Sequence, residues 1–440
     1  MKKCVVSMAV PAIFAQLVNV LYSIVDRIYI GHIPDVGSTA LTGLGVAVPI
    51  ISLITAFTAL CGTGGAPLCS IARGRGEMER AEHIMGCAFT ILIIIGVVLT
   101  AVSLAFMRPI LYLFGASDGT YPYAAAYARI YVSGTLFVMI SLGMNYFINA
   151  QGFAKIGMLT VAIGAVLNII LDPVLIFVFN MGIAGAAYAT VFSQFCSAAW
   201  AMAFLTGRKA ILKLRASCLK PDTETVKKIL ALGVTGFIAN VTNSLVMICQ
   251  NSQLLKYGGD LYVGTMTIIN SVREVIFMVV HGFTTSSQPV MGFNYGAGKP
   301  ERVREVIKFI TQAVLVYCAA VWLIVMLIPG ALAAVFTTDE TLLALSGPSM
   351  RLFFCGFIFM GLQGAGQSTF VGLGLAKRAA TFSILRKVVI VVPLVYILPL
   401  FFGVNGVFIA EPVSDLLGGG ACFLTMYFTV YRKLKTQSIL

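Results

Sequence analysis

Two carboxylates lie inside apolar stretches of this sequence, where an ionised side chain is costly. Asp172 belongs to VLNIILDPVLIF (166–177) and follows Asn168 by four residues, so the two share one face of a helix. Asp26 lies in a second apolar stretch. In hydrocarbon an ionised Asp costs about 2.5–3.5 kcal/mol on insertion scales. A partner or a function must offset that cost.

Two kinds of chemistry suit such a pair. Burial disfavours the ionised form, so a buried carboxyl group can take up a proton on one side of a membrane and release it on the other. Alternatively, carboxylate, Asn and Thr oxygens form a site for a hard cation such as Na⁺, with Asp26, Asn168 and Asp172 as candidate ligands. If cation and substrate binding are coupled, either chemistry produces exchange.

Each residue also has a structural alternative. Asp26 is followed by Arg27 and could form an ion pair near an interface. Asp172 precedes Pro173, which frees a backbone carbonyl and kinks a helix, so the carboxylate could simply lie at a kink. A lone intramembrane Asn such as Asn145 is often a helix–helix hydrogen bond. Taken as a set, the residues favour a function.

Helix rise predicts that these groups lie at compatible depths. The turn between two apolar stretches falls near Ile156, with Asn145 before it and Asn168 after it. Both amides then lie about 17 Å from one surface, and Asp172 about 6 Å farther. Asp26 falls late in an outward helix. We therefore expect Asp26, Asn145, Asn168 and Asp172 to share one cavity.

The composition defines the setting of these residues. Of 440 residues, 59% are hydrophobic and only 11% charged, with a mean hydropathy of +0.95, which indicates an integral membrane protein. The ten cysteines and three scattered histidines show no CxxC pair and no His-rich metal site. Twelve membrane spans are expected at 5–30, 41–64, 82–107, 122–149, 157–179, 185–205, 225–252, 261–288, 305–328, 346–372, 379–401 and 405–431.

The net charge of +13 follows the expected topology. With the N-terminus inside, the inner segments carry 24 of the 30 basic residues, among them Arg386 and Lys387. This pattern satisfies the positive-inside rule and predicts that both termini are cytoplasmic. The basicity therefore does not indicate a nucleic-acid partner.

The first half of the chain recurs in the second at a nearly constant shift. RGRGEMERAE (73–82) matches YGAGKPERVR (295–304). Six spans in each copy predict an all-α integral membrane protein of 12 transmembrane helices, in two six-helix bundles related by a pseudo-two-fold axis along the membrane normal. The expected divisions are 1–205, a cytoplasmic linker 206–224, and 225–440. Further pairs at the same shift are Pro67/Pro289, Phe114/Phe336, Arg129/Arg351, Gly134/Gly356, Gly152/Gly374 and Lys155/Lys377, while 182–189 matches 403–410 after a single deletion.

The two halves differ in their acidic residues. Asn168 and Asp172 correspond to Ile390 and Leu394, and Asp26 also has no acidic counterpart. An asymmetric polar site in a duplicated scaffold points to function. GAGK (296–299) lacks the Ser or Thr of a P-loop, so an ion gradient is the expected energy source.

A substrate cavity would be lined by the polar stripe of the first span together with polar and Met side chains of the second half. The candidate lining residues are Gln16, Asn19, Tyr22, Asn240, Asn243, Met247, Glu274, Gln363 and Gln367.

The ordered set VDRIYIG, NIILDPVLIF and QPVMGFNYGAG resembles the multidrug and toxic compound extrusion (MATE) family, in its prokaryotic DinF/MepA-type branch. The resemblance implies an antiporter that exports mostly cationic, amphipathic compounds in exchange for H⁺ or Na⁺, with no other cofactor. It implies that Asp26 and Asp172 are the coupling carboxylates. Further implied members of this network are Asn168, Asn145, Thr190 and Tyr127, with Pro11 as a conformational hinge.

The chain departs from some relatives, which carry an acidic residue in the seventh or tenth span. Here the acidic candidates of the second half are Glu274, Glu411 and Asp415. A flippase for a lipid-linked saccharide is the alternative, but its anionic head group would need more basic residues inside the spans. A membrane-embedded enzyme would need a nucleophile–base pair or a metal cluster. We expect a functional monomer in a bacterial or archaeal plasma membrane.

Overall fold

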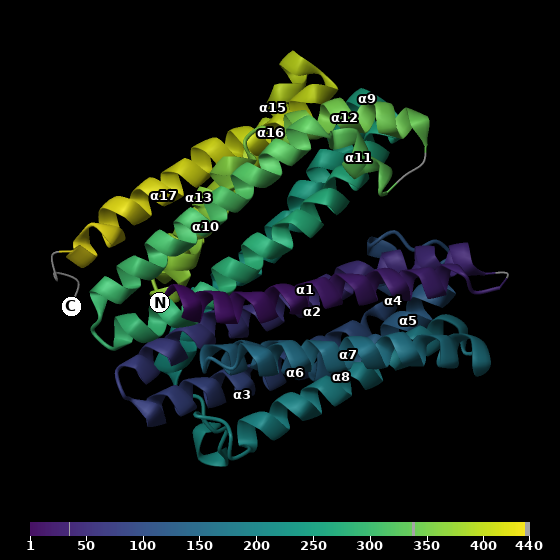
Figure 1. The fold of residues 1–440 in the computed structure, drawn as a ribbon. Coiled ribbons are helices and arrows are strands. Elements are labelled where there is room, and N and C mark those ends of the chain that lie inside the picture. Colours follow the sequence, from purple (N-terminus) through teal and green to yellow (C-terminus); the bar gives the residue numbers. More distant parts are fainter. Residues whose placement is uncertain (35, 337–338, 436–440) are drawn as a thin grey trace. The chain divides into compact units, whose positions relative to one another are not determined.

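The computed structural model describes residues 1–34, 36–336 and 339–435, and these residues form helices and connecting segments without a strand (Figure 1). Ten helices are long and apolar enough to cross a membrane, and the number rises to twelve if each of two bent helix pairs forms one span, counted over the described residues. The predicted fold class is confirmed.

The long helices follow the predicted spans closely. The α-helices are α1 (Lys2–Gly31), α2 (Gly37–Gly74), α3 (Met78–Ala105), α4 (Met107–Leu113), α5 (Tyr121–Ser133), α6 (Thr135–Ala150), α7 (Ala154–Pro173), α8 (Gly182–Thr206), α9 (Thr223–Gly296), α10 (Pro300–Leu327), α11 (Pro329–Ala334), α12 (Glu340–Phe354), α13 (Phe357–Gly372), α14 (Ala376–Ile384), α15 (Val392–Phe402), α16 (Val404–Ser414) and α17 (Gly420–Met426). The π-helical segments are η1 (Val174–Val178), η3 (Leu385–Val391), η4 (Asp415–Gly419) and η5 (Tyr427–Tyr431), and short 3-10 turns are η2 (Ala216–Cys218) and η6 (Lys433–Lys435).

The helix α9 contains two of the predicted spans. Its backbone leaves helical geometry at Gly259, where φ is 71°, so Thr223–Gly259 and Leu261–Gly296 are separate membrane-spanning helices. Glycine adopts a positive φ without the steric penalty that a side chain imposes. The predicted spans 225–252 and 261–288 are likewise separated at this point of the chain.

The chain divides into two compact units by its internal contacts. One contains Val10–Phe237, and the other contains Met1–Ala9 with Ile238–Leu440. In the first unit α2 packs on α3 and α6, and α7 packs on α8, and these helices run alongside one another (Figure 1). In the second unit α10 and α17 both pack on α13.

The sequence repeat is also a repeat of backbone geometry. Gly152 and Gly374, which match in the repeat, have φ values of 92° and 72°. The helices α5 and α6 meet at Gly134 with a bend of 56°, and α12 and α13 meet before Phe357, next to Gly356, with a bend of 46°. Each bent pair is thus one predicted span, the fourth or the tenth. The duplicated glycines set equivalent bends and turns in both halves.

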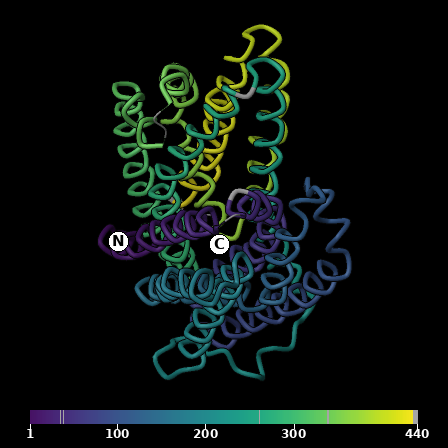
Figure 2. The backbone as a smooth tube through the Cα atoms, turned by 90° about the vertical axis from the view of Figure 1, so that its right-hand side faces the viewer, coloured from purple at the N-terminus to yellow at the C-terminus, as the bar shows by residue number. Residues whose placement is uncertain are grey.

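The linker after α8 lies against the first unit. The Gln151 Oε1 atom accepts hydrogen bonds from the backbone N–H groups of Ile211 and Leu212 at 3.0 and 2.9 Å. The Glu82 Oε1 atom accepts one from Lys213 N–H at 2.9 Å. In Figure 2 the teal chain that follows α8 runs along the edge of this unit before it enters α9.

One assignment of the charge analysis is wrong. Arg386 and Lys387 belong to η3 and are buried, with exposed fractions of 7% and 6%. They follow ten or more residues of the helix that begins at Ala376, which places them about 15 Å along it. They therefore lie in the interior of the second unit and do not belong to an inner loop.

Candidate functional site

Asp172 lies where the helix α7 changes geometry. Pro173 follows it and lacks an N–H group, so it frees the carbonyl four residues earlier. The chain then continues in the π-helical segment η1. Segments of this kind are rare and are frequent at functional sites. The expected irregularity at Pro173 is present, and the Asp172 side chain is fully buried beside it.

Asn168 joins the carboxylate to the next helix. Its Nδ2 atom donates to Asp172 Oδ1 at 3.1 Å and to Thr190 Oγ1 of α8 at 3.3 Å. The helices α7 and α8 approach closely because Gly164 has no side chain: a Cβ atom there would lie 2.6 Å from Ser197 Oγ. This close packing brings Asn168 within reach of Thr190.

Two further helices complete the cluster. Asp26 projects from α1, and its carboxyl group lies within hydrogen-bonding reach of the Asp172 carboxyl group. Tyr127 projects from α5, and its hydroxyl group lies near Thr190. Both residues are buried. Arg27, the residue after Asp26, is exposed, and its positive charge acts on the Asp26 carboxyl group.

Several oxygen atoms of this cluster have no hydrogen-bond donor. Among the described residues, Asp26 Oδ1, Asp172 Oδ2 and Asn168 Oδ1 are buried and unpartnered. Buried polar atoms nearly always have a partner, and unpartnered carboxylate oxygens are especially costly. A proton shared by the two carboxyl groups, or a cation held by the three oxygens, would remove this cost. Asp26, Asn168 and Asp172 are thus the residues that could hold a metal cation such as Na⁺.

A small polar cavity adjoins the cluster. Its volume is about 20 Å³, which is room for about one water molecule. Two residues predicted to line a substrate cavity, Asn19 and Tyr22, contribute to its wall. Other residues of the wall include Ser141, Asn168, Thr190, Ser193, Gln194 and Ser197.

The sequence analysis missed the polar face of α8. Thr190, Ser193 and Ser197 follow one another at steps of three and four residues and therefore line one face of the helix. Ser193 Oγ and Gln194 Oε1 are buried without a partner among the described residues. The spacing of these hydroxyl residues is the sequence signal that predicts this face.

Asn145 is not brought into the cluster. Its Nδ2 atom donates to Gly157 O at 3.2 Å. In the other half, Gln367 Nε2 donates to Ala379 O at 3.0 Å. Donor and acceptor are both matched in the repeat, so the same helix–helix hydrogen bond occurs in the two copies. This duplicated bond supports the structural alternative for Asn145.

The depth estimate failed because the turn was misplaced. The helix α6 ends at Ala150 and α7 begins at Ala154, so the turn precedes the predicted position near Ile156. Asn145 is then about 10 Å from the turn and Asn168 about 20 Å or more from it. The two amides lie at different levels.

The other predicted lining residues are scattered. Gln16 is half-buried on α1, and Pro11 lies inside the same helix. Asn240, Asn243, Met247 and Glu274 are exposed on α9. Gln363 is buried on α13, and its Oε1 atom has no donor among the described residues. Gln367, described above, also bonds Ser383 Oγ at 2.9 Å.

The second unit contains a buried cluster of five charges. Glu411 Oε1 lies 2.7 Å from Lys387 Nζ, 3.4 Å from Arg273 Nη2 and 3.7 Å from Arg386 Nη1. Arg386 Nη1 also pairs with Asp415 Oδ1. The acidic candidates Glu411 and Asp415 are thus neutralised by basic side chains, whereas Asp26 and Asp172 are paired with each other.

The fold defines a helical membrane protein built from two copies of one six-span unit. The family model MatE matches residues 11–174 and 236–397, once in each copy. The chain therefore belongs to the MatE family, as the sequence motifs predicted.

Similar proteins agree with this assignment over the full chain. The multidrug export protein MepA of Staphylococcus aureus (strain MSSA476) is 24% identical over 433 residues, covering 97% of this chain and 93% of the relative. MepA of Staphylococcus haemolyticus (strain JCSC1435) is 23% identical and covers 98% and 93%.

Solved structures share the fold. A crystal structure of MATE in the bent conformation matches with a TM-score of 0.93 and 23% identity, over 100% of this chain and 97% of that one. A MOP superfamily transporter from Pyrococcus furiosus matches with a TM-score of 0.91 and 23% identity, over 99% and 96%.

Proposed function

We propose that this protein is an antiporter that exports amphipathic, mostly cationic drugs or toxic compounds by alternating access, driven by H⁺ or Na⁺. The observation that carries the proposal is the pair Asp26 and Asp172: two buried carboxyl groups that lie close together, each with an oxygen that lacks a donor among the described residues. Such a pair is stable only with a proton or a cation between its members.

The supporting residues suit reversible binding of one cation. Asn168 holds Asp172 and Thr190 together at 3.1 and 3.3 Å, and Tyr127 contacts Thr190 from α5. Loss of the cation from this cluster would leave two carboxylates facing each other. Their repulsion would favour a rearrangement of α1 relative to α7, because the pair joins these two helices. Pro11, inside α1, is the proposed hinge.

The asymmetry of the two halves supports a coupling site in the first unit. The positions equivalent to Asn168 and Asp172 are Ile390 and Leu394. The acids of the second unit are held by Arg386, Lys387 and Arg273 and are not free to exchange a cation without breaking ion pairs. We therefore propose one coupling site per chain.

The proposed substrate class follows from the relatives, which are named multidrug export proteins. Cation-coupled exchange requires that the cation and the substrate favour different states of the transporter. Asn19 and Tyr22 extend the polar surface from the coupling cluster along α1. We propose that a cationic substrate binds beside Asn19 and Tyr22, where it is attracted by the charge of Asp26.

A lipid-linked saccharide flippase is less well supported. An anionic head group would need several unpaired basic side chains, but Arg386 and Lys387 form ion pairs with Asp415 and Glu411.

We also propose that the chain is not an enzyme, that it acts as a monomer, and that it resides in the plasma membrane of a prokaryote with both termini cytoplasmic. The boundaries 1–205 and 225–440 remain our proposal for the two bundles.

The experiment is transport of a fluorescent organic cation by the purified protein in proteoliposomes, under an imposed proton or sodium gradient. Wild type should move the cation only with one of these gradients, which identifies the coupling ion. Asp172→Asn should lower gradient-driven transport to the rate of protein-free vesicles, because the amide cannot release a proton or hold Na⁺ as a carboxylate does.

The control is Asp118→Asn, the same substitution at an exposed loop residue that accepts a hydrogen bond from Tyr112. It should leave transport unchanged. Gradient-driven transport that survives Asp172→Asn would place the coupling site elsewhere. Wild-type protein that moves no organic cation under either gradient would contradict the proposed function.

A further inference from the structure

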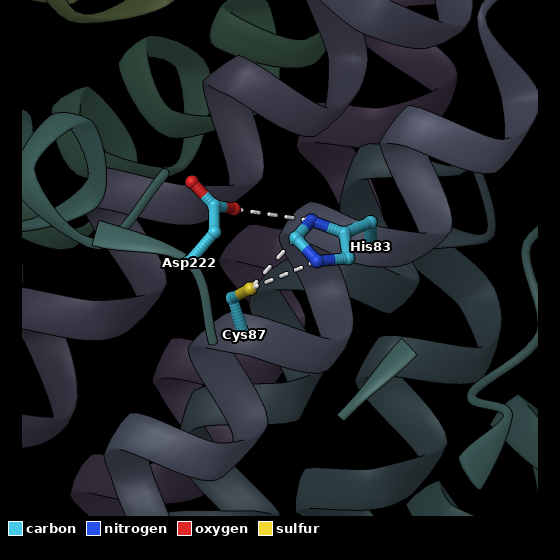
Figure 3. A group of neighbouring side chains, drawn as sticks. All are labelled: His83, Cys87 and Asp222. Carbon is cyan, nitrogen blue, oxygen red and sulfur yellow. Dashed lines mark hydrogen bonds and ion pairs between the residues drawn. The ribbon is translucent and has the colours of Figure 1, made fainter. Parts of the chain in front are cut away.

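A second cluster of metal-ligating side chains lies far along the chain from the coupling site. His83 and Cys87 are four residues apart on one face of α3, and Asp222 comes from the end of the linker (Figure 3). One ligand atom from each residue can be chosen so that all three lie within 4.8 Å of one another. We propose that these three residues bind a zinc ion.

The two distances from the His83 ligand atom are close to those of a zinc site. His83 Nδ1 lies 3.5 Å from Asp222 Oδ2 and 3.7 Å from Cys87 Sγ. Zinc binds His nitrogen and carboxylate oxygen at about 2.0–2.2 Å and Cys sulfur at about 2.3 Å, so tetrahedral ligands are about 3.3–3.6 Å apart. Small side-chain rotations would therefore close the three groups around one ion.

Neighbouring groups already hold the ligands in place, and Cys87 Sγ is itself 3.7 Å from the Lys220 carbonyl oxygen. His83 Nε2 is 3.1 Å from the Lys220 carbonyl oxygen, which matches the hydrogen bond by which a zinc-bound His is usually oriented. Asp222 Oδ1 accepts from Thr225 N–H at 2.8 Å, so its Oδ2 atom is left to face His83. Supporting hydrogen bonds of this kind tune a metal site and fix its ligands.

The mixture of ligand atoms selects the metal. Thiolate sulfur and imidazole nitrogen favour Zn²⁺ over Mg²⁺ or Ca²⁺, which prefer oxygen. An ion pair between His83 and Asp222 would not need the buried Cys87 thiol, whose Sγ atom lies against the imidazole ring. Three protein ligands leave the fourth position for water.

Access to the cluster is open. A cavity of about 410 Å³ adjoins it and has His83 in its wall. The two arginines of this wall are paired, Arg80 with Glu77 at 3.0 Å and Arg215 with Glu82 at 3.4 Å, so they do not act as unpaired charges against a cation. Other residues of the wall are Glu79, Ser217 and Cys218.

A bound ion would fasten the linker to α3 at the point where α9 begins. Thr90 Oγ1 already donates to Leu219 O at 2.7 Å, and the Cys218 backbone packs on Gly86, where a Cβ atom would lie 2.1 Å from Cys218 O. Zinc bound by His83 and Cys87 of α3 and by Asp222 of the linker would join these two segments through metal–ligand bonds. The sequence could not indicate this site, because Asp222 lies far from His83 along the chain, beyond four of the predicted spans.

The test measures zinc binding to the purified full-length protein in which Cys4 and Cys355, the exposed cysteines, are replaced by Ser. This parent should bind one Zn²⁺ per chain and, with Co²⁺, show the visible absorption of a tetrahedral thiolate site. His83→Ala and Cys87→Ala should lose both signals. Cys218→Ala, which removes a neighbouring thiol outside the cluster, is the matched control and should keep both.

Asp222→Asn keeps the capping oxygen for α9 but removes the carboxylate, so folding is preserved by design. Its zinc affinity should fall by at least about tenfold. Each variant without zinc should still unfold in one cooperative thermal transition, and addition of zinc should raise the unfolding temperature only for the parent and the control. Unchanged zinc stoichiometry in His83→Ala and Cys87→Ala, or no zinc binding by the parent, would overturn the proposal.

Discussion

The substitution Glu411→Gln tests how the buried charges of the second unit are held. It removes the carboxylate shared by Lys387, Arg273 and Arg386 at 2.7, 3.4 and 3.7 Å. Arg386 keeps Asp415 as a partner, and Arg273 is 22% exposed. Lys387, only 8% exposed, is the residue left without a counter-charge.

The expected loss follows from that geometry. Removing one partner of a buried ion pair leaves an uncompensated charge and typically costs about 3–5 kcal/mol. We therefore expect Glu411→Gln to lower the free energy of unfolding by about that amount. Replacing both partners, in Glu411→Gln with Lys387→Met, should restore about 2 kcal/mol, within the range of about 0.5–3 kcal/mol for coupled residues.

The assay is equilibrium unfolding in mixed micelles of a mild detergent and SDS. The control is Glu77→Gln, which removes the same group from an exposed pair with Arg80 at 3.0 Å and should cost less than about 1 kcal/mol. If Glu411→Gln costs no more than this control, or the double variant is less stable than both single variants, the cluster is not held together as described.

Three further predictions concern the repeated geometry and the start of α9. Asn145→Ala and Gln367→Ala should each cost about 0.5–1.5 kcal/mol, the net worth of one neutral hydrogen bond, and should leave the ion dependence of transport unchanged, as the same unfolding and transport assays would measure. Gly152→Ala should cost about 1–2 kcal/mol, because φ is 92° and no neighbouring atom lies near the added Cβ, so the loss is backbone strain alone. Hydrogen bonds from the side chain and backbone of Thr225 hold the pKa of Asp222 below its usual range. The pKa of Asp222 is therefore lower in the folded protein than in the unfolded one. The stability that the Asp222 carboxylate gives to the start of α9 is present above the unfolded pKa and is lost as pH falls through the folded pKa. Asp222→Ala should thus destabilise the metal-free protein at neutral pH, and the loss should become smaller as pH falls through that folded pKa, as thermal unfolding across pH would detect.

Much of the fold could be predicted because it depends on local and repeated signals. Long apolar stretches indicated the spans, and the constant shift between matching segments identified the two copies. The matched glycines were informative for a physical reason: Gly152 and Gly374 occupy positive-φ turns, and Gly134 and Gly356 lie at the bends of the fourth and tenth spans.

The candidate site was predictable where residues share a helix and less so where they do not. The step from Asn168 to Asp172 places both on one face, and the structure joins them at 3.1 Å. Thr190 and Tyr127 lie on other helices, and only the resemblance to a known family suggested them. Asn145 was expected to share the cavity of Asn168. An error of a few residues in the position of the turn changed the depth of Asn145 relative to Asn168.

The sequence did not indicate which acidic residues neutralise the buried basic residues of the second unit. Arg386 and Lys387 were counted with the inner segments, although they also lie inside the predicted span 379–401. The structure agrees with the span and not with the charge count, because both side chains are buried. Their partners, Glu411 and Asp415, come from the next helix. Charge counts therefore could not separate interior ion pairs from surface charges, and the orientation that they indicate stays a prediction.

The most direct test of the coupling site is proton or sodium release when substrate binds. A fluorescent organic cation is added to purified protein in weakly buffered detergent solution, and released H⁺ or Na⁺ is counted per chain. Wild type should release one cation, and Asp26→Asn and Asp172→Asn should release none while remaining folded. Substrate binding without cation release in wild type would contradict the proposal that Asp26 and Asp172 exchange a cation for substrate. Release by either variant that equals the release by wild type would also contradict it.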